Sequence, residues 1–525
     1  MNLFVTTITQ PPGSHATSSL PGTGKSTTIY HVIKSRVQED RRVLITSIRN
    51  QAIDAVTEKV DSFGVLVFGS EARLGEYAKR FTITGRMRND PELVFWRQRL
   101  TSWTKTLQAV EAISWKQLHL LPAFPGLTRL LELEQESMRH GGNLRSVKGI
   151  QLRKSGKAAG RWAFALERVL RTNYYQRLKH GNRSQKLMYR QLHALDKFKT
   201  LLRDGQARVT TILMRLEALT RFRIFTDTRV LICTVDSTER MLRSMEEGAV
   251  AAALAVGGIA ASSAGSHLLT LDTAIMDEAA CVLETSIPVV LALGIKNLLL
   301  VGDHHQLQPF SQIRENDAGK HHNRSLMERC ISGGRANEFL DTQYRMHPSL
   351  SQIVSTTFYE NKLKTADALQ RTRRSCEPCK WVHVSGGEIK HQGRGYSNSL
   401  EIPRVVEQVR AAQQQYGHEA DIRVITFYNM QKRELERKFS SQPDLGNIRI
   451  ASVDSCQGSD ADVVVISTVR SGDVGYKLSG FMLDPRRVNV AISRAKEQCI
   501  IVGDKHTLRS GGGALWRSIA DHFTS

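Results

Sequence analysis

Short apolar runs, each ending in a polar or glycine-containing turn, recur along the 525-residue chain. Such runs are typical of strands that are buried on both faces of a parallel sheet, with functional side chains following their carboxyl ends. Helical patterns separate several of the runs, which predicts the α/β class. The runs are Val43–Ile45, Val230–Cys233, Ala274–Met276, Leu298–Val301, Val424–Ile425, Val463–Ile466 and Cys499–Val502.

One long segment, from about Arg86 to Thr228, lacks this strand pattern. Apolar residues recur in it at helical spacing, which predicts a helical insert within the first α/β domain. No heptad run or internal repeat in the sequence is long enough to indicate a coiled coil or a solenoid. The helical spacing is seen at Trp162, Leu166, Val169 and Leu170 and again at Leu192, Leu195, Phe198 and Leu202.

Positive charge is concentrated in this insert. The chain has a formal net charge of +22, and the segment from Arg139 to Arg223 holds 21 Lys or Arg against four acidic residues, a net +17. The alternative is a solvated helix bundle whose charge is incidental. So dense a basic segment favours contact with a polyanion, and we expect a nucleic-acid partner.

Neither a membrane span nor a zinc site is predicted. The most apolar stretch, Ala249–Ala264, is short and rich in Ala and Gly, so a flexible or helical insert is the better interpretation. Cys376 and Cys379 form a CxxC pair without a second pair at matching spacing. No secretory signal pattern begins the sequence. Free thiols are typical of a reducing compartment, so we expect an intracellular protein, cytoplasmic or nuclear.

The segment PGTGKST, residues 21–27, has the pattern of a phosphate-binding loop. Backbone N–H groups of Gly22, Thr23, Gly24 and the residues up to Thr27 would surround the phosphates. Lys25 would reach the β- and γ-phosphate oxygens, and the Ser26 hydroxyl would ligate Mg²⁺. A chance glycine turn is the alternative, and the loop by itself indicates only a nucleotide.

The first position of this loop departs from the pattern, because Ser19 stands where glycine is expected. Removal of the nine residues Ser14–Gly22 would leave QPPGTGKST directly after the strand-like run Leu3–Ile8, with Gln10 in place of the first glycine. We therefore hypothesise that Ser14–Gly22 is an insertion, in the protein or in the gene model. A titration of nucleotide binding by the nine-residue deletion tests this, and equal affinity would defeat the hypothesis.

Two further motifs follow predicted strands. In DEAA, Asp277 is suited to hold Mg²⁺ and Glu278 to orient and deprotonate a water, although an acidic helix start is the alternative. In GDHHQLQP, the amide of Gln306 is a candidate sensor of the γ-phosphate. His304 and His305 favour a non-metal interpretation, because adjacent side chains diverge where a strand ends.

Taken with these motifs, QYRMHP (343–348), VDSCQG (453–458) and RRVNVAISRAK (486–496) resemble a superfamily 1 helicase of the up-frameshift and senataxin-like branch. The resemblance covers Val43–Asp54 and the chain from Val230 to about Leu508. It implies two RecA-like domains, the first made of residues 1–85 and 229–315 and the second of residues 316–525. The basic helical insert, residues 86–228, and the extreme N-terminus are not covered by the resemblance. The family's glutamine motif and upstream β-barrel are expected to be missing, as in a fragment or a truncated gene model.

The resemblance also implies roles for single residues. Lys25, Ser26, Asp277 and Glu278 would act as described above. Arginine side chains that reach the γ-phosphate from a second domain, called arginine fingers, make hydrolysis depend on closure of the two domains. Gln306 would sense the γ-phosphate, Tyr344 would stack on the adenine, Arg345 and Arg494 would be arginine fingers, and Gly458 and Asp460 would lie near the ribose and phosphates.

A strand-binding face is implied as well. Asn50, Ala52 and Asp54 match the family's first such motif, whereas Arg49 stands where serine is usual. Backbone contacts of this kind follow a strand without reading its sequence. Further candidates are Thr234, Thr426, Tyr428 and Gln431.

We therefore expect an ATP-dependent helicase or translocase that uses ATP and Mg²⁺ and moves on single-stranded RNA or DNA, with 5′-to-3′ movement implied by the resemblance. A catalytically impaired, nucleic-acid-binding helicase relic is the alternative from another class. A P-loop kinase or small GTPase leaves the motifs of the second domain without an explanation.

Overall fold

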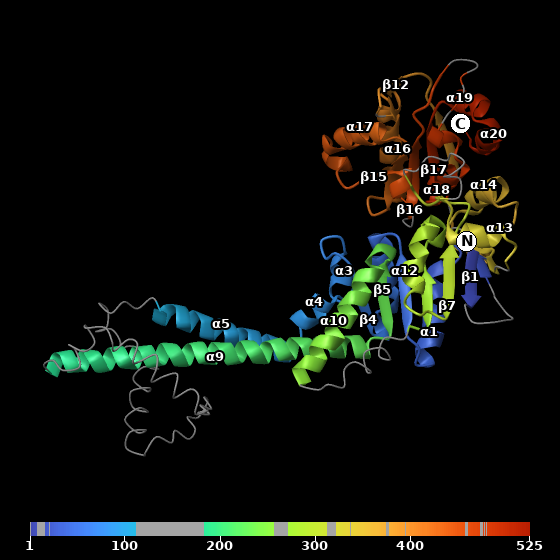
Figure 1. The fold of residues 1–525 in the computed structure, drawn as a ribbon. Coiled ribbons are helices and arrows are strands. Elements are labelled where there is room, and N and C mark those ends of the chain that lie inside the picture. Colours follow the sequence, from blue (N-terminus) through green and yellow to red (C-terminus); the bar gives the residue numbers. More distant parts are fainter. Residues whose placement is uncertain are drawn as a thin grey trace. The chain divides into compact units, whose positions relative to one another are not determined.

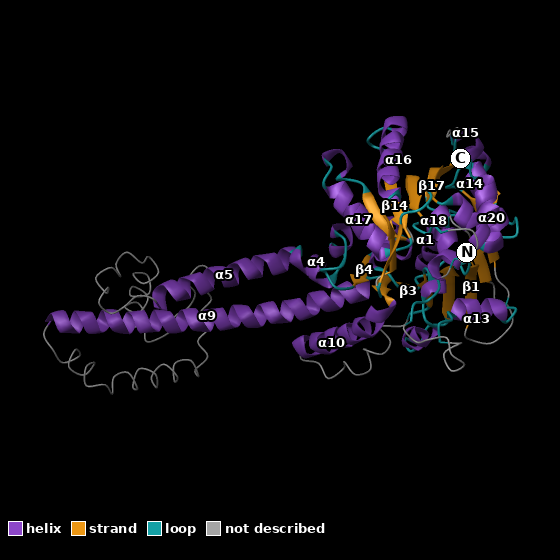
Figure 2. Cartoon of the chain, turned by 90° about the horizontal axis from the view of Figure 1, so that it is seen from above, coloured by secondary structure: helices purple, strands orange, loops and turns teal. Residues whose placement is uncertain are grey.

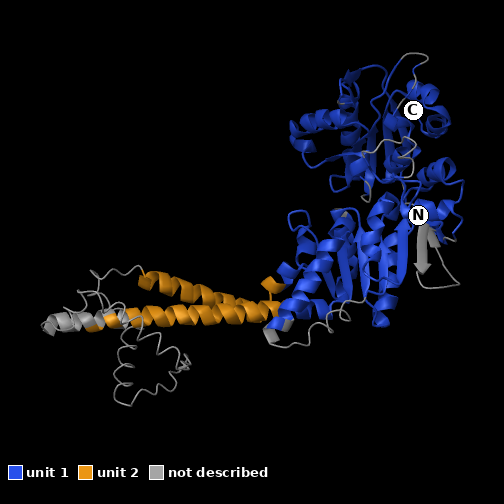
Figure 3. Ribbon diagram, in the orientation of Figure 1, with its two compact units in different colours: residues 1–86, 222–525 blue, residues 87–221 orange. Residues whose placement is uncertain are grey.

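The computed structural model describes residues 2–7, 16–19, 22–111, 183–256, 271–311, 322–335, 338–373, 377–393, 395–456, 460–472, 476, 478 and 480–524. The chain forms two compact units, Met1–Arg86 together with Phe222–Ser525, and Met87–Arg221 (Figure 3). The first unit contains two separate large sheets, each with five parallel strands, and the parts of the chain built on them are called the first lobe and the second lobe below.

The first lobe is built on five parallel strands in the order β4 (Val65–Phe68), β5 (Val230–Thr234), β3 (Val43–Ser47), β6 (Thr273–Met276) and β7 (Asn297–Gly302). The sheet continues from β7 through β1 (Asn2–Thr7), which is antiparallel to β7, to β2 (Ala16–Ser19) and β8 (Glu338–Leu340). Helices cover both faces of the parallel strands, whose residues are almost all buried (Figure 2). This burial explains why the strands are continuous apolar runs in the sequence.

The second lobe is built on five parallel strands in the order β11 (Cys379–His383), β17 (Ala495–Gly503), β16 (Ala461–Ser467), β14 (Ile422–Thr426) and β15 (Arg449–Ser452). All seven apolar runs named from the sequence are therefore strands of one of the two sheets. The predicted fold, α/β with two RecA-like parallel-sheet domains, is confirmed.

The helices and small sheets complete the two lobes (Figure 1). In the first lobe these are α1 (Lys25–Gln38), α2 (Asn50–Val60), α3 (Glu76–Lys79), α4 (Ile83–Arg88), α10 (Thr238–Val256), α12 (Ile287–Leu291) and α13 (Leu326–Ser332). In the second lobe these are β9 (Thr342–Gln343), α14 (Pro348–Phe358), β10 (Lys364–Thr365), α15 (Asp367–Thr372), β12 (Glu388–His391), β13 (Gly395–Asn398), α16 (Glu401–Tyr416), α17 (Asn429–Ser440), α18 (Pro485–Ile492), α19 (Lys505–Gly511) and α20 (Gly513–His522).

The second unit contains α5 (Pro91–Glu111) and most of α9 (Arg183–Asp227), which lie side by side in opposite directions (Figures 1 and 2). Gln206 donates a hydrogen bond to Thr104 at 3.0 Å. Gly205 is required at this contact, because a Cβ there would lie 2.0 Å from the ring of Trp103. The predicted helical run from Leu192 to Leu202 lies in α9, whereas the run beginning at Trp162 lies outside the described residues.

Among the described residues, none of the helices combines the length and the apolar character that crossing a bilayer requires. The apolar stretch Ala249–Ala264 begins within α10, which ends at Val256.

Candidate functional site

The glycine loop at residues 22–24 leads directly into α1. Gly22 and Gly24 have left-handed backbone angles, φ 75° and 79°, and Lys25 is the first residue of the helix. The N–H groups at this helix start are free of intrahelical partners and carry the positive end of the helix dipole, so the loop is suited to hold an anion.

The loop is in close contact with the second lobe. Tyr344 donates its backbone N–H to the carbonyl of Gly22 at 2.8 Å. A Cβ on Gly22 would lie 2.5 Å from the Cβ of Arg345. Glycine is thus needed at residue 22 both for its backbone angle and for this approach.

The acidic pair follows β6. Lys25 Nζ lies 3.3 Å from Glu278 Oε1, which joins the loop to the acidic pair. Burial, followed by the negative charge of Glu278, raises the pKa of Asp277. Burial opposes ionisation of Glu278 too, but the positive charges of Lys25 and Arg494 hold its pKa below the usual value. Glu278 is therefore the more acidic carboxylate of the pair and is ionised at neutral pH, the state in which it can accept a proton.

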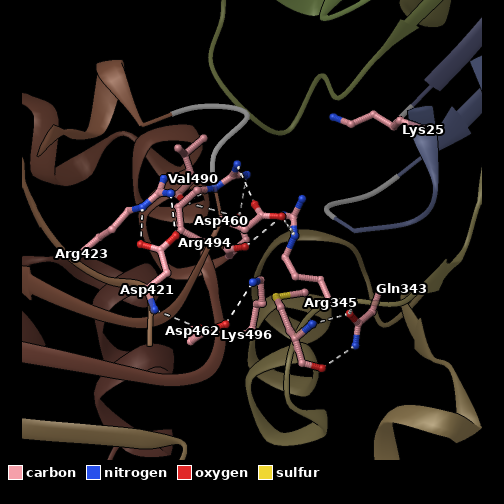
Figure 4. A network of polar contacts seen from close by, with 12 residues as sticks. Lys25, Gln343, Arg345, Asp421, Arg423, Asp460, Asp462, Val490, Arg494 and Lys496 are labelled. Atoms are coloured by element: carbon pink, nitrogen blue, oxygen red, sulfur yellow. Dashed lines mark hydrogen bonds and ion pairs between the residues drawn. The ribbon is translucent and has the colours of Figure 1, made fainter. Parts of the chain in front are cut away.

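Two arginines of the second lobe converge on one carboxylate (Figure 4). Arg345 Nε lies 2.6 Å from Asp460 Oδ2, and Arg494 Nη1 lies 3.6 Å from Asp460 Oδ1. Arg494 also donates to Gln306 Oε1 of the first lobe at 3.2 Å. Burial lowers the pKa of Arg345 to about 10, so this guanidinium remains charged at neutral pH. The two predicted fingers are held side by side by Asp460.

A cavity of about 1010 Å³ brings the predicted residues together from both lobes. Tyr344 is 61% exposed, as a ring available for stacking must be. Gln306 is buried and does not itself line the cavity, but it accepts a hydrogen bond from Arg494, which does. Gly458 lies outside the described residues. The lining includes Gly22, Thr23, Gly24, Lys25, Ser26, Thr27, Asp277 and Glu278 from the first lobe and Tyr344, Arg345, Asp460 and Arg494 from the second.

Several predicted strand contacts have other roles in the structure. Gln431 is fully buried, and its side-chain amide bonds to Asn398 and Ser467. The prediction that this side chain contacts a nucleic-acid strand is therefore wrong. Tyr428 is buried and its hydroxyl accepts a hydrogen bond from Arg470. The carboxylate of Asp54 accepts the N–H of Gly75. Asp54 lies in α2 and Gln431 in α17, and the direction of each side chain depends on packing that the sequence pattern does not report.

Several contacts between the lobes are not predicted from the sequence. Arg49 donates to the carbonyl of Asp454 at 2.7 Å. Tyr359 and Asn489 bond to residues of the GDHHQLQP motif. The departure of Arg49 from the usual serine is a signal for one of these contacts, whereas the partners lie 56 to 405 residues apart in the chain.

A glycine loop before a helix, a lysine paired with an acidic residue after a neighbouring strand, and arginines from a second sheet define a P-loop nucleotide-binding protein. A family model described as an AAA domain matches residues 5–312, and a second with the same description matches residues 322–506. The first covers more than half of the chain. The chain therefore belongs to this family, as a member of the superfamily 1 helicases of the up-frameshift-like branch.

Curated proteins of the same branch are similar to this chain in sequence. The chain is 34% identical over 267 residues to "Regulator of nonsense transcripts 1" of Dictyostelium discoideum, covering 47% of this chain and 19% of that protein. It is 32% identical over 267 residues to "ATP-dependent helicase NAM7" of Saccharomyces cerevisiae, covering 48% of this chain and 27% of that protein. The chain thus spans less than a third of the length of these relatives.

Among solved structures, the arterivirus nonstructural protein 10 helicase in complex with DNA is 9% identical, with a TM-score of 0.34, covering 93% of this chain and 60% of that one.

Proposed function

We propose that this chain is an ATP-dependent helicase or translocase that moves along a single strand of RNA or DNA, in the 5′-to-3′ direction. The observation that supports this most is the cavity shared by the lobes. Lys25 and Glu278 line it from the first lobe, and Arg345 and Arg494 line it from the second. A nucleotide held there would touch both sheets, so its hydrolysis would change how they meet.

The side chains present fit ATP and Mg²⁺. Gly22 and Gly24 free the loop N–H groups for phosphates, and Lys25 supplies a cation beside them. The Ser26 hydroxyl and the Asp277 carboxylate both line the cavity and are oxygen ligands of the kind that Mg²⁺ prefers. When bound, the metal neutralises charge that develops on the transferring phosphoryl group.

The residues of the two lobes then divide the work of hydrolysis. Glu278, held ionised by neighbouring cations, would orient a water and accept its proton. Arg345 and Arg494 would stabilise negative charge on the phosphoryl oxygens, while Tyr344 would stack on the adenine. Asp460 orients both arginines, because its two carboxylate oxygens face them. Opening of the lobes would withdraw the fingers and stop the reaction.

The strand is expected to cross both lobes and to be gripped further by the basic insert, residues 86–228. The remaining division of the chain is proposed as residues 1–85 and 229–315 for the first domain and 316–525 for the second. Pairing of β8 with β2 supports a boundary that lies nearer Leu340. An intracellular location, cytoplasmic or nuclear, remains a prediction from the free cysteines.

Replacement of Lys25 by Ala tests the proposal. We expect strand-stimulated ATPase activity to fall by at least about 100-fold, as is typical when a residue that stabilises the transition state is removed. Glu278→Ala should give a comparable loss. The control is Lys34→Ala, which removes an exposed lysine from the same helix. Undiminished turnover in either site variant contradicts the mechanism. A wild-type chain that binds the strand without hydrolysing ATP would establish the helicase relic instead.

A further inference from the structure

A ring of buried polar side chains joins the two lobes beside the nucleotide cavity. In the first lobe, Gln306 Nε2 donates to Asp303 Oδ2 at 2.8 Å. From the second lobe, Tyr359 Oη donates to the same oxygen at 2.6 Å, and Asn489 Nδ2 donates to Tyr359 Oη at 2.7 Å. The ring closes at Arg494, which follows α18, because its Nη2 donates to Gln306 Oε1 at 3.2 Å.

The members of the ring are shielded from water, with exposed fractions of 2% or less. Hydrogen bonds in such surroundings strengthen one another, and a member left unpaired is costly. Burial, followed by the charge of Asp303, raises the pKa of Tyr359 well above its usual value. Its hydroxyl therefore stays protonated and remains a donor. The lobes are thus joined through a set of bonds with a defined geometry.

Two arms of this ring connect Gln306 to α18. The direct arm is the bond from Arg494 to Gln306. The relay arm passes from Gln306 through Asp303 and Tyr359 to Asn489. Under the proposed function, Gln306 and Arg494 are both ligands of the γ-phosphate, so Arg494 would exchange the direct arm for a bond to phosphate. The amide nitrogen of Gln306 has two N–H donors. One can turn to phosphate while the other stays on Asp303, so the relay arm is able to persist.

We propose that Tyr359 is a positioning residue that transmits the nucleotide state of Gln306 to α18 and so to the grip of the second lobe on the strand. This inference rests on the proposed function and adds a part to it. Tyr359 follows α14, which packs against α18 and α20 of the second lobe. Its hydroxyl reaches into the first lobe. One hydrogen-bonding atom therefore ties the sensor segment to the helix that precedes Arg494.

The hydroxyl can be removed without removing the side chain. The ring of Tyr359 packs edge-on against His305, with centroids 5.1 Å apart. In Tyr359→Phe, Asp303 would still accept from Gln306, and Asn489 Nδ2 would still donate to the carbonyl of His305 at 2.9 Å. The two groups that bond to the Tyr359 hydroxyl each keep another partner, so we expect the variant to fold and to keep its nucleotide cavity.

The test measures how the affinity for a fluorescent single-stranded oligonucleotide depends on the bound nucleotide. For the wild type, the ratio of Kd with ADP to Kd with a non-hydrolysable ATP analogue should differ from one by about 5- to 150-fold, the usual range of coupling between sites. Tyr359→Phe should bring this ratio to within about twofold of one, while its Kd for the ATP analogue changes by less than about twofold. A purely structural role for Tyr359 would instead weaken binding equally in both nucleotide states.

The control is Tyr77→Phe, which removes a hydrogen bond from a tyrosine hydroxyl to the carboxylate of Asp61 within the first lobe. It should leave the ratio at the wild-type value. Asn489→Ala removes the relay arm from its other end and should lower the ratio as Tyr359→Phe does. A wild-type ratio in Tyr359→Phe overturns the inference.

A measurement without nucleotide or strand separates this inference from the proposed function. Thermal unfolding of Tyr359→Phe, Asn489→Ala and the double variant gives the coupling between these residues. Non-additive shifts in Tm support the relay, and additive shifts overturn it. If the wild-type chain neither binds the oligonucleotide nor hydrolyses ATP, the proposed function fails. The Tm values of the two single variants and the double variant still decide whether the relay exists.

Discussion

Gly22 shows how strictly a single residue of the site is constrained. Its backbone is left-handed, and it faces the Cβ of Arg345. Gly22→Ala should therefore push the loop away from the second lobe and weaken ATP binding by at least about 10-fold, since the clash adds to about 1–2 kcal/mol of backbone strain. Gly294→Ala is the control, because Gly294 is also left-handed but has open space around it. Calorimetric titration with ATP compares them. Equal affinities for the two variants would contradict the contact.

Glu401 is a buried carboxyl group in the second lobe that gives stability an expected dependence on pH. It accepts hydrogen bonds from Ser467 Oγ and from the N–H of Val469, whose φ is 71°. Burial raises the pKa of Glu401 to about 8. Because the folded chain then keeps a proton that the unfolded chain releases above its lower pKa, stability should fall as pH rises from about 4.5 to 8 and then level off.

Glu401→Gln mimics the protonated carboxyl and removes this dependence. We expect the Tm of the variant, relative to wild type, to increase between pH 5 and pH 8 in thermal melts. The exposed Glu419→Gln serves as the control and should follow the wild type at each pH. A Tm difference between Glu401→Gln and wild type that does not change with pH would show that the native carboxyl is not protonated.

At the scale of elements, the segments after β3 and β15 meet across the two lobes. Arg49 follows β3 and donates to the carbonyl of Asp454, whose carboxylate pairs with Arg487 at 2.9 Å. Arg49→Ser removes one hydrogen bond from the closed arrangement, about 0.5–1.5 kcal/mol, so strand-stimulated kcat should fall by about 2- to 10-fold. Arg41→Ser is the matched control, because Arg41 pairs with Asp272 inside the first lobe. A kcat unchanged by Arg49→Ser would contradict a role in closure.

The elements themselves were largely predictable. Strands such as β3 and β16 are continuous apolar runs because both faces of each sheet are covered, and this leaves a clear mark in the sequence. The loop at Gly22 and the acidic residues at 277–278 follow from local chemistry. The pairing of Asp460 with Arg345 and the relay through Tyr359 cannot be predicted in this way. They join segments that are far apart in the chain, and the local sequence does not indicate that such segments meet. Side-chain direction, as at Gln431, depends on packing in the same way.

At the scale of the whole molecule, the basic charge of the second unit is expected to bind the nucleic-acid strand. In α9, Arg208 and Arg215 are exposed, and α9 holds ten Lys or Arg against four acidic residues. A polyanion bound by such residues releases counterions, so its affinity falls steeply with salt. The sequence predicted a nucleic-acid contact from this charge, and the exposure of the two arginines makes the contact testable.

The double variant Arg208→Ala, Arg215→Ala should weaken binding of a single-stranded oligonucleotide and should also flatten its salt dependence. Each lost phosphate contact reduces the slope of log K against log salt by about 0.7 for single strands, so the slope should shrink by about 1.4. The control variant Arg404→Ala, Arg509→Ala removes two exposed arginines of α16 and α19 that already pair with Glu407 and Asp521. Fluorescence titrations across a range of salt concentrations give the slopes. Parallel lines for wild type and Arg208→Ala, Arg215→Ala would mean that α9 does not touch the strand, because weaker binding at an unchanged slope cannot come from a lost phosphate contact.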